Sequence, residues 1–287
     1  MWSGALALWR DHLLPVWAVS WAPAYGHYFA TGGADRTARI YAIDHAPNAL
    51  RVFTGHKSDV TCVAFHPNIN YLATGSADRC VRLYDVKTAK PVRIFSGHKG
   101  SVQSLAFSPC GRFLASGAWC GSICVWDLAQ GGLIGQLGGY CTPASEESSN
   151  TNGNSMEPDT ETPPHENQEE TPSDRLLTGP VVSLEFCPSG NGVLAAGGLE
   201  GALRFWNTGT GHNSYMSMPW SAGNLMSIHR DLNSGPVTGT GYPMVALGDS
   251  VSKTCLIDSF YTRKTSVLAL KYIHPRLILC AGPYNQN

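Results

Sequence analysis

The residues of this chain that could do chemistry are its cysteines, its histidines and one glycine-rich segment. The nine cysteines could bind a metal as thiolates, but no CxxC pair occurs, and Cys120 and Cys124 have no second pair to complete a zinc site. Thr238-Gly-Thr-Gly241 lacks the strand, turn and helix of a phosphate loop, so a turn is expected there. Paired catalytic carboxylates, HExxH and GxSxG are also missing. We therefore expect no enzyme activity, no metal and no cofactor.

The composition favours many short strands over long helices. Only 14% of the residues are charged, and the chain has 31 glycines, 18 prolines and eight tryptophans. Most cysteines lie in apolar runs such as Thr61-Cys62-Val63, so buried, reduced thiols are expected. Residues 1–9 form no basic leader, and no run of about 18 apolar residues occurs. We expect a soluble, intracellular, all-β protein with no membrane association.

Internal repeats predict the architecture. One pattern of alternating apolar and small residues that ends at a proline occurs four times, as Trp17-Ala-Val-Ser-Trp-Ala-Pro23, Thr61-Cys-Val-Ala-Phe-His-Pro67, Gln103-Ser-Leu-Ala-Phe-Ser-Pro109 and Val182-Ser-Leu-Glu-Phe-Cys-Pro188. The prolines are 44, 42 and 79 residues apart, and the last interval becomes ordinary without an insert of roughly 37 residues. A period of 40 to 45 residues is typical of propeller blades.

Three further strands are expected after each proline. Second strands are predicted at 28–31, 71–74, 113–116 and 193–196, third strands at 38–41, 81–84, 123–126 and 203–206, and fourth strands at 50–53, 92–95 and 133–137. Residues 265–272 and 277–280 resemble two strands of an incomplete blade. Such small sheets must stack radially to form a core. The sequence predicts a β-propeller of four clear blades plus a partial one: three repeats in 1–139, then one blade and the partial terminal blade in 176–287.

Residues 140–175 interrupt the repeats. The stretch 139–174 holds nine acidic residues and no lysine or arginine, although the formal net charge of the whole chain is only −1. Because it has almost no apolar side chains, it cannot bury enough surface to offset the entropy of ordering. We expect a disordered acidic insert.

The pairs Gly55-His56, Gly97-His98 and Trp126-Asp127, with the turns at Asp35 and Asp78, resemble the WD40 family. That resemblance implies a buried network in each blade, made of a histidine, a hydroxyl on the second strand, an aspartate in the next turn and a tryptophan on the third strand. The matching positions are His12, Thr31, Asp35 and Tyr41; His56, Thr74 or Ser76, Asp78 and Tyr84; His98, Ser116 and Trp126; and Trp206. Two tyrosines replace tryptophan, Cys120 replaces the third aspartate, and the fourth blade has Glu200 and no histidine.

Several longer strings resemble one WD40 family in particular. Pro15-Val-Trp17 and residues 29–39, 65–79 and 92–100 are similar to the fifth subunit family of the TATA-binding-protein-associated factors, found in transcription factor IID and, as a paralogue, in SAGA-type acetyltransferase complexes. The resemblance implies a nuclear, non-catalytic scaffold whose seven-bladed propeller docks histone-fold and other associated-factor subunits. Because this chain begins near the third blade of that family, an N-terminally truncated propeller is expected.

The repeat register also predicts a basic face. Lys57 and Lys99 precede first strands, whereas Arg36 and Arg79 follow second strands, and these loops lie on the same face of a propeller. We regard them as the candidate partner-binding face. The acidic insert should emerge on that face and fold back over it.

Two other function classes stay open at this point. A substrate-receptor propeller of a ubiquitin ligase would use the same arginines to bind a phosphorylated or acidic peptide. Direct nucleic-acid binding is not expected, because clustered aromatics and dense arginine are missing, and no small-molecule substrate is implied. Trp21, Trp119 and Trp220 fall outside the third-strand register, and core or edge packing is expected for them.

Overall fold

The computed structural model describes residues 8–23, 26–44, 48–138, 179–190, 192–208, 255–262, 265–274 and 277–283. All the regular elements in these ranges are β-strands, so no helix among them could cross a membrane. The acidic insert expected at 140–175, the Thr238-Gly-Thr-Gly241 turn and Trp220 lie outside the described residues.

Three complete antiparallel sheets form the N-terminal half, and each is a meander of four strands that are consecutive in the chain. Blade 1 contains β1 (Val16–Trp21), β2 (Tyr28–Gly33), β3 (Ala38–Ala42) and β4 (Arg51–Phe53). Blade 2 contains β5 (Val60–Phe65), β6 (Tyr71–Ser76), β7 (Cys80–Asp85) and β8 (Pro91–Ser96), and blade 3 contains β9 (Val102–Phe107), β10 (Phe113–Ala118), β11 (Ile123–Asp127) and β12 (Gly132–Leu137). These sheets confirm the all-β fold of WD40-type blades.

The fourth sheet is completed by a strand that sequence analysis missed. Blade 4 contains β13 (Val181–Phe186), β14 (Val193–Gly198), β15 (Ala202–Asn207) and β16 (Cys255–Tyr261). β16 pairs with β15 in antiparallel register, although 47 residues separate them in sequence. A two-stranded sheet of β17 (Ala269–His274) and β18 (Leu277–Ala281) follows, as expected for the partial blade.

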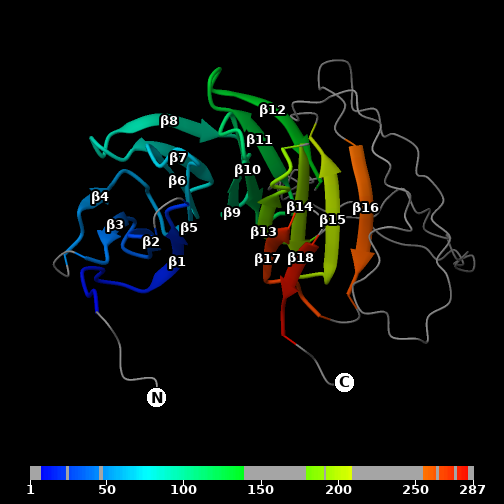
Figure 1. Cartoon of the computed structure of the whole chain (residues 1–287), viewed down its shortest axis with the longest axis horizontal. Helices are drawn as coiled ribbons and strands as arrows, with labels where there is room; N and C mark the ends of the chain where they lie inside the picture. The colour runs from blue at the N-terminus through cyan, green and yellow to red at the C-terminus, as the bar shows by residue number, and fades with distance from the viewer. Residues whose placement is uncertain are drawn as a thin grey trace, which may run out of the picture.

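The sheets follow one another around an arc, and their first strands lie side by side from β1 to β17 (Figure 1). The core lies between consecutive sheets: Ala30 and Ile40 of blade 1, for example, belong to one buried cluster with Val63 and Leu72 of blade 2. Apolar burial between sheets, which is worth about 25 cal/mol per Å², therefore stabilises every blade through its neighbours.

A glycine near the end of each second strand permits this close stacking. A Cβ on that glycine would come within 2.6 to 2.8 Å of a valine Cγ1 of the next sheet, in the pairs Gly32 and Val60, Gly75 and Val102, Gly117 and Val181, and Gly197 and Val267. Any side chain would force the sheets apart. The repeat thus places a glycine where the next blade packs.

The outward face of blade 1 differs from the same face of the other blades. Val60 and Phe65 of blade 2 are buried against blade 1, but the matching residues Val16 and Trp21 of blade 1 are 45% and 56% exposed. Trp21 is therefore not a core residue, but its ring lies 5.4 Å from that of Phe29, which agrees with the expectation of packing at an edge. Its position is a core position of the repeat, and it is exposed because no described sheet precedes blade 1.

Candidate functional site

The second blade holds a complete histidine, hydroxyl and carboxylate network. His56 Nδ1 donates to Asp78 Oδ2 at 2.9 Å, and Thr74 Oγ1 lies 2.7 Å from His56 Nε2. Because a carboxylate can only accept, Nδ1 carries the hydrogen and Nε2 accepts from Thr74. Ser76, the alternative position, instead accepts from the Asp78 backbone N–H at 3.0 Å.

Asp78 also fixes the backbone around it. Its carboxylate accepts from the backbone N–H groups of Lys57 at 2.9 Å and Cys80 at 3.0 Å. Burial opposes ionisation of this group, but the hydrogen bonds from Lys57 and His56 outweigh burial and lower the pKa of Asp78. The pKa of His56 is lowered because burial outweighs the opposing effect of Asp78. A neutral imidazole and a carboxylate therefore tie the loop before β5 to the turn after β6.

The first blade repeats this arrangement. His12 lies 2.8 Å from Asp35 Oδ2 through Nδ1 and 2.7 Å from Thr31 Oγ1 through Nε2. The Thr37 backbone N–H and hydroxyl donate to Asp35 Oδ1, and these bonds with that of His12 outweigh burial and lower the pKa of Asp35. The network again joins the segment before the first strand to the turn between the second and third strands.

The tyrosines that replace tryptophan in blades 1 and 2 are fully buried. Tyr41 and Tyr84 are each 1% exposed, and burial raises the pKa of both phenols. The Tyr84 hydroxyl donates to the Thr54 backbone carbonyl at 2.9 Å, which ties β7 to the end of the preceding blade. Tyrosine thus keeps the core position and bonds to the backbone of a neighbouring loop.

The third blade buries the same histidine without a carboxylate. The Trp126 indole N–H donates to Ser116 Oγ at 2.8 Å, and Ser116 Oγ lies 2.6 Å from His98 Nε2. His98 Nδ1 lies 3.4 Å from Ser122 Oγ. With burial as the cause, the pKa of His98 falls to about 4. A chain of neutral groups therefore replaces the hydrogen bond between histidine and carboxylate of blades 1 and 2.

The fourth blade retains only the tryptophan. Ala196 occupies the position of Thr74 and Ser116 in the repeat, so Trp206 Nε1 has no hydrogen-bond partner among the described residues. Glu200, at the position of Asp78, instead lies 3.8 Å from the Arg204 guanidinium. Trp206 is 7% exposed and acts as an apolar core residue.

An aromatic residue three positions before each histidine also belongs to these sites, and sequence analysis missed it. Phe53 packs on Tyr84 and Phe95 on Trp126, each with ring centroids 5.2 Å apart, and Trp9 lies 6.1 Å from Tyr41. The signal was available, because each histidine is preceded at that spacing by an aromatic residue. The contacts of Phe53 and Phe95 join the last strand of one blade to the third strand of the next, whereas Trp9 lies before the first strand of blade 1.

The networks anchor the turns that carry the expected basic face. Arg36, Lys57, Arg79 and Lys99 are all exposed. Arg36 and Arg79 directly follow the network aspartates and have φ angles of 64° and 66°, where blades 3 and 4 have Gly121 and Gly201. A left-handed backbone costs a non-glycine residue about 1 kcal/mol, and the bonded aspartate beside each arginine holds this conformation.

Trp119 lies at the same end of the sheets, in the turn after β10, and is 54% exposed. The prediction of core or edge packing is wrong for this residue. An exposed tryptophan beside basic turns is a common anchor for a protein partner. The candidate face is therefore defined as Arg36, Lys57, Arg79, Lys99 and Trp119.

The seven cysteines whose side chains the structure describes form no disulfide and differ in exposure. Cys62, Cys124 and Cys187 are buried as expected, whereas Cys110 and Cys280 are exposed. The expectation of buried thiols is wrong for these last two, because Cys110 lies in the β9–β10 turn and Cys280 on the outermost sheet. No group of three potential metal ligands occurs in the described ranges.

Comparison with known proteins supports the same architecture. The family model "WD domain, G-beta repeat" matches residues 5–42, 47–85 and 89–127. Each match ends on or beside a third strand, and each contains one histidine and hydroxyl pair. The model covers blades 1 to 3 but not blade 4, which has lost the histidine.

One curated relative is "Transcription initiation factor TFIID subunit 5" of Caenorhabditis elegans. It is 46% identical to this chain over 57 residues, which are 19% of this chain and 9% of the relative. The chain thus matches only a small part of that protein's length. Taken with the sheets and the histidine networks, these findings show that the chain contains WD40 repeats folded as β-propeller blades.

Proposed function

We propose that this chain is a non-catalytic scaffold subunit of a nuclear transcription initiation complex of the TFIID type. Its partners would be histone-fold and other associated-factor subunits, bound on the candidate face. The likeness to a TFIID subunit over 57 residues supports the choice of complex. The observation that carries a docking role is that four exposed basic side chains stand on turns held by buried networks.

A preorganised face favours protein binding for a physical reason. The carboxylates of Asp35 and Asp78 accept hydrogen bonds from backbone N–H groups and so already fix the turns that carry Arg36 and Arg79. Little backbone entropy is therefore lost on association. The positive charges would steer an acidic surface into place, and Trp119 would bury apolar area at the contact.

Affinity purification of the tagged chain from nuclear extract tests the choice of complex. Recovery of histone-fold subunits with other TFIID components supports the proposal. Recovery of acetyltransferase subunits would assign the chain to a SAGA-type complex, and recovery of a cullin-ligase adaptor would assign it to a ubiquitin ligase. Either of those results would overturn the TFIID assignment.

A matched pair of variants tests the face itself. The variant with Arg36→Gln, Lys57→Gln, Arg79→Gln and Lys99→Gln should lose most of the co-purified partner, and Trp119→Ala should lose a similar share. The control with Lys87→Gln and Lys90→Gln changes exposed residues in the β7–β8 turn, at the other end of the sheets. Equal recovery with all the variants would rule out this face as the docking surface.

A further inference from the structure

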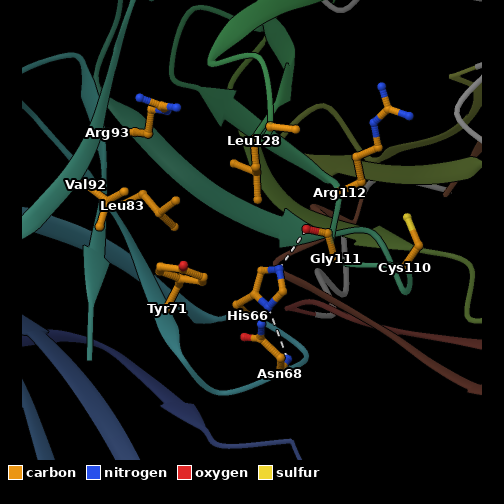
Figure 2. Close-up of a pocket in the computed structure, with 11 residues that line it drawn as sticks. His66, Asn68, Tyr71, Leu83, Val92, Arg93, Cys110, Gly111, Arg112 and Leu128 are labelled. Carbon is orange, nitrogen blue, oxygen red and sulfur yellow. Dashed lines mark hydrogen bonds between the residues drawn. The ribbon is translucent and has the colours of Figure 1, made fainter. Parts of the chain in front are cut away.

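A pocket lies between blades 2 and 3, at the end of the sheets opposite the candidate face (Figure 2). Its volume is about 470 Å³. The β5–β6 turn, the β9–β10 turn and the ends of β7 and β11 surround it. A hollow of this size suits one bulky side chain and its neighbouring backbone. It does not suit the flat surface of a folded protein.

The repeat differs between the two turns that border the pocket. In the β5–β6 turn, Ile69 has a φ of 64° and packs against the core between blades 1 and 2. The matching residue in the β9–β10 turn is Gly111, with a φ of 75°. A Cβ on Gly111 would lie 2.5 Å from the His66 ring, so glycine is required where this ring crosses between the blades.

The His66 ring is a neutral and fully bonded wall of the pocket. His66 Nε2 lies 2.7 Å from the Gly111 carbonyl oxygen, and the Asn68 backbone N–H donates to His66 Nδ1 at 3.1 Å (Figure 2). Since a carbonyl can only accept, Nε2 carries the hydrogen and Nδ1 accepts. Both ring nitrogens are therefore occupied, and a ligand would meet His66 only as an aromatic surface.

The remaining walls are apolar and the rim is basic. Tyr71, Leu83 and Leu128 line the pocket, and Arg93 and Arg112 stand at its edge (Figure 2). Arg112 donates to Asp127 Oδ2 through Nε and Nη2, at 3.1 and 2.9 Å. Arg93 makes no ion pair with any residue that the structure describes. Arg93 thus offers an uncompensated guanidinium beside an apolar hollow.

We propose that this pocket is a second docking site, which binds a short acidic peptide segment of a partner protein through one bulky aliphatic side chain. The side chain would occupy the hollow between Tyr71, Leu83 and Leu128. A carboxylate one or two residues away would bond to Arg93, whose planar donors match a carboxylate. This site is separate from the candidate face, so either proposal can fail without the other.

Fluorescence anisotropy with defined peptides tests the proposal on the full chain. The probe is a fluorescein-labelled peptide with a central leucine and two glutamates on each side, compared with the same peptide carrying serine for leucine. Arg93→Glu should weaken binding of the leucine probe about tenfold, since it replaces an attraction with a repulsion. Val92→Ser, which removes part of an exposed apolar wall, should weaken it about threefold.

Arg10→Glu is the matched control, because it makes the same charge reversal at an exposed residue that belongs to neither the pocket nor the candidate face. It should leave binding unchanged, and thermal unfolding should show that all three variants stay folded. Failure of the leucine probe to bind, equal binding of the serine peptide, or an equal loss in Arg10→Glu would overturn the proposal.

Two thiols that are exposed in the described part of the chain provide an independent readout of where the peptide binds. Cys110 lines the pocket, whereas Cys280 lies on the β18 strand of the terminal sheet. A chloroacetyl group on the leucine peptide should alkylate Cys110 at least fivefold faster than the serine peptide does, with no such difference at Cys280. Peptide mapping by mass spectrometry measures both, and equal enhancement at the two cysteines would place the probe elsewhere.

Discussion

Blades 2 and 3 bury a histidine at the same place in the repeat but satisfy it in different ways. His56 bonds to a carboxylate and a threonine, whereas His98 bonds to two serines, one of which accepts from Trp126. The shared part is a hydroxyl on the second strand. The fold therefore depends on pairing the ring nitrogens, and the choice between a charged and a neutral partner decides how the blade responds to acid.

Removal of the carboxylate should give the largest difference in stability between a change in blade 2 and the matching change in blade 3. Asp78→Ala removes the acceptor for His56 and for two backbone N–H groups, so it should lower the free energy of unfolding by about 3 kcal/mol. Cys120→Ala, at the matching position of blade 3, should lower the free energy of unfolding by less than about 1 kcal/mol. Urea unfolding of both variants measures the difference. Equal losses would mean that Asp78 has no special role.

Acid should destabilise the chain through His98. Because the pKa of His98 is lowered from 6.5 to about 4 by burial, the unfolded chain binds a proton between these values and the folded chain does not. Stability from His98 is thus complete above pH 6.5 and falls by about 1.4 kcal/mol per pH unit toward pH 4. Urea unfolding at pH 7, 6 and 5 should show a shallower pH dependence for His98→Gln than for the unchanged chain. Parallel curves would contradict this origin.

A carboxylate introduced into blade 3 should make the response of this blade to acid similar to that of blade 2. In Cys120→Asp the new side chain would face His98 and could accept from Ser122, as Asp35 accepts from Thr37. The charge should raise the pKa of His98 and increase stability at pH 5 by about 1.5 kcal/mol. The histidine Cε1 proton shift, followed by NMR titration, reports the pKa directly. An unchanged titration would show that position 120 does not reach the ring.

The smallest effect is expected in blade 4. Ala196→Ser would place a hydroxyl opposite the unpartnered Trp206 indole N–H, as Ser116 does for Trp126. The new hydroxyl could donate to the Arg204 carbonyl, as Ser116 does to Cys124. The free energy of unfolding should rise by about 1 kcal/mol. Ala195→Ser, a neighbouring buried position, is the control and should destabilise the chain.

The fold followed closely from the sequence because its signal repeats. Four copies of one strand pattern, each ended by a proline, located the first three strands of every blade to within a few residues. Sequence analysis did not predict β16, because 47 residues separate it from its partner β15. The spacing that identified the other fourth strands is therefore missing. The repeat therefore predicts a strand only where the usual number of residues separates that strand from its neighbour in the sheet.

The sites were less accessible to sequence reasoning. The positions of His56 and Asp78 followed from the resemblance to WD40 repeats. The choice of Thr74 over Ser76, which lie on the same face of β6, depends on the position along the strand that the ring contacts. The pocket beside His66 could not be foreseen, because it depends on contacts between blades 2 and 3, such as the packing of the His66 ring on Gly111. Exposure of Trp21 depends on its neighbours in space, which the repeat pattern does not contain.

The uncovered outer side of blade 1 has a consequence for how the molecule comes apart. Among the described sheets, the middle ones pack against a neighbour on both sides, whereas blade 1 packs against a neighbour on one side only. Val16 and Trp21 on its other side face solvent. Such a stack is a one-dimensional array in which the end unit opens at the lowest cost. Amide protons of β2 should therefore exchange sooner than those of β6 and β10. Thermal unfolding should begin at the two end sheets, blade 1 and the β17–β18 sheet, before the middle sheets unfold.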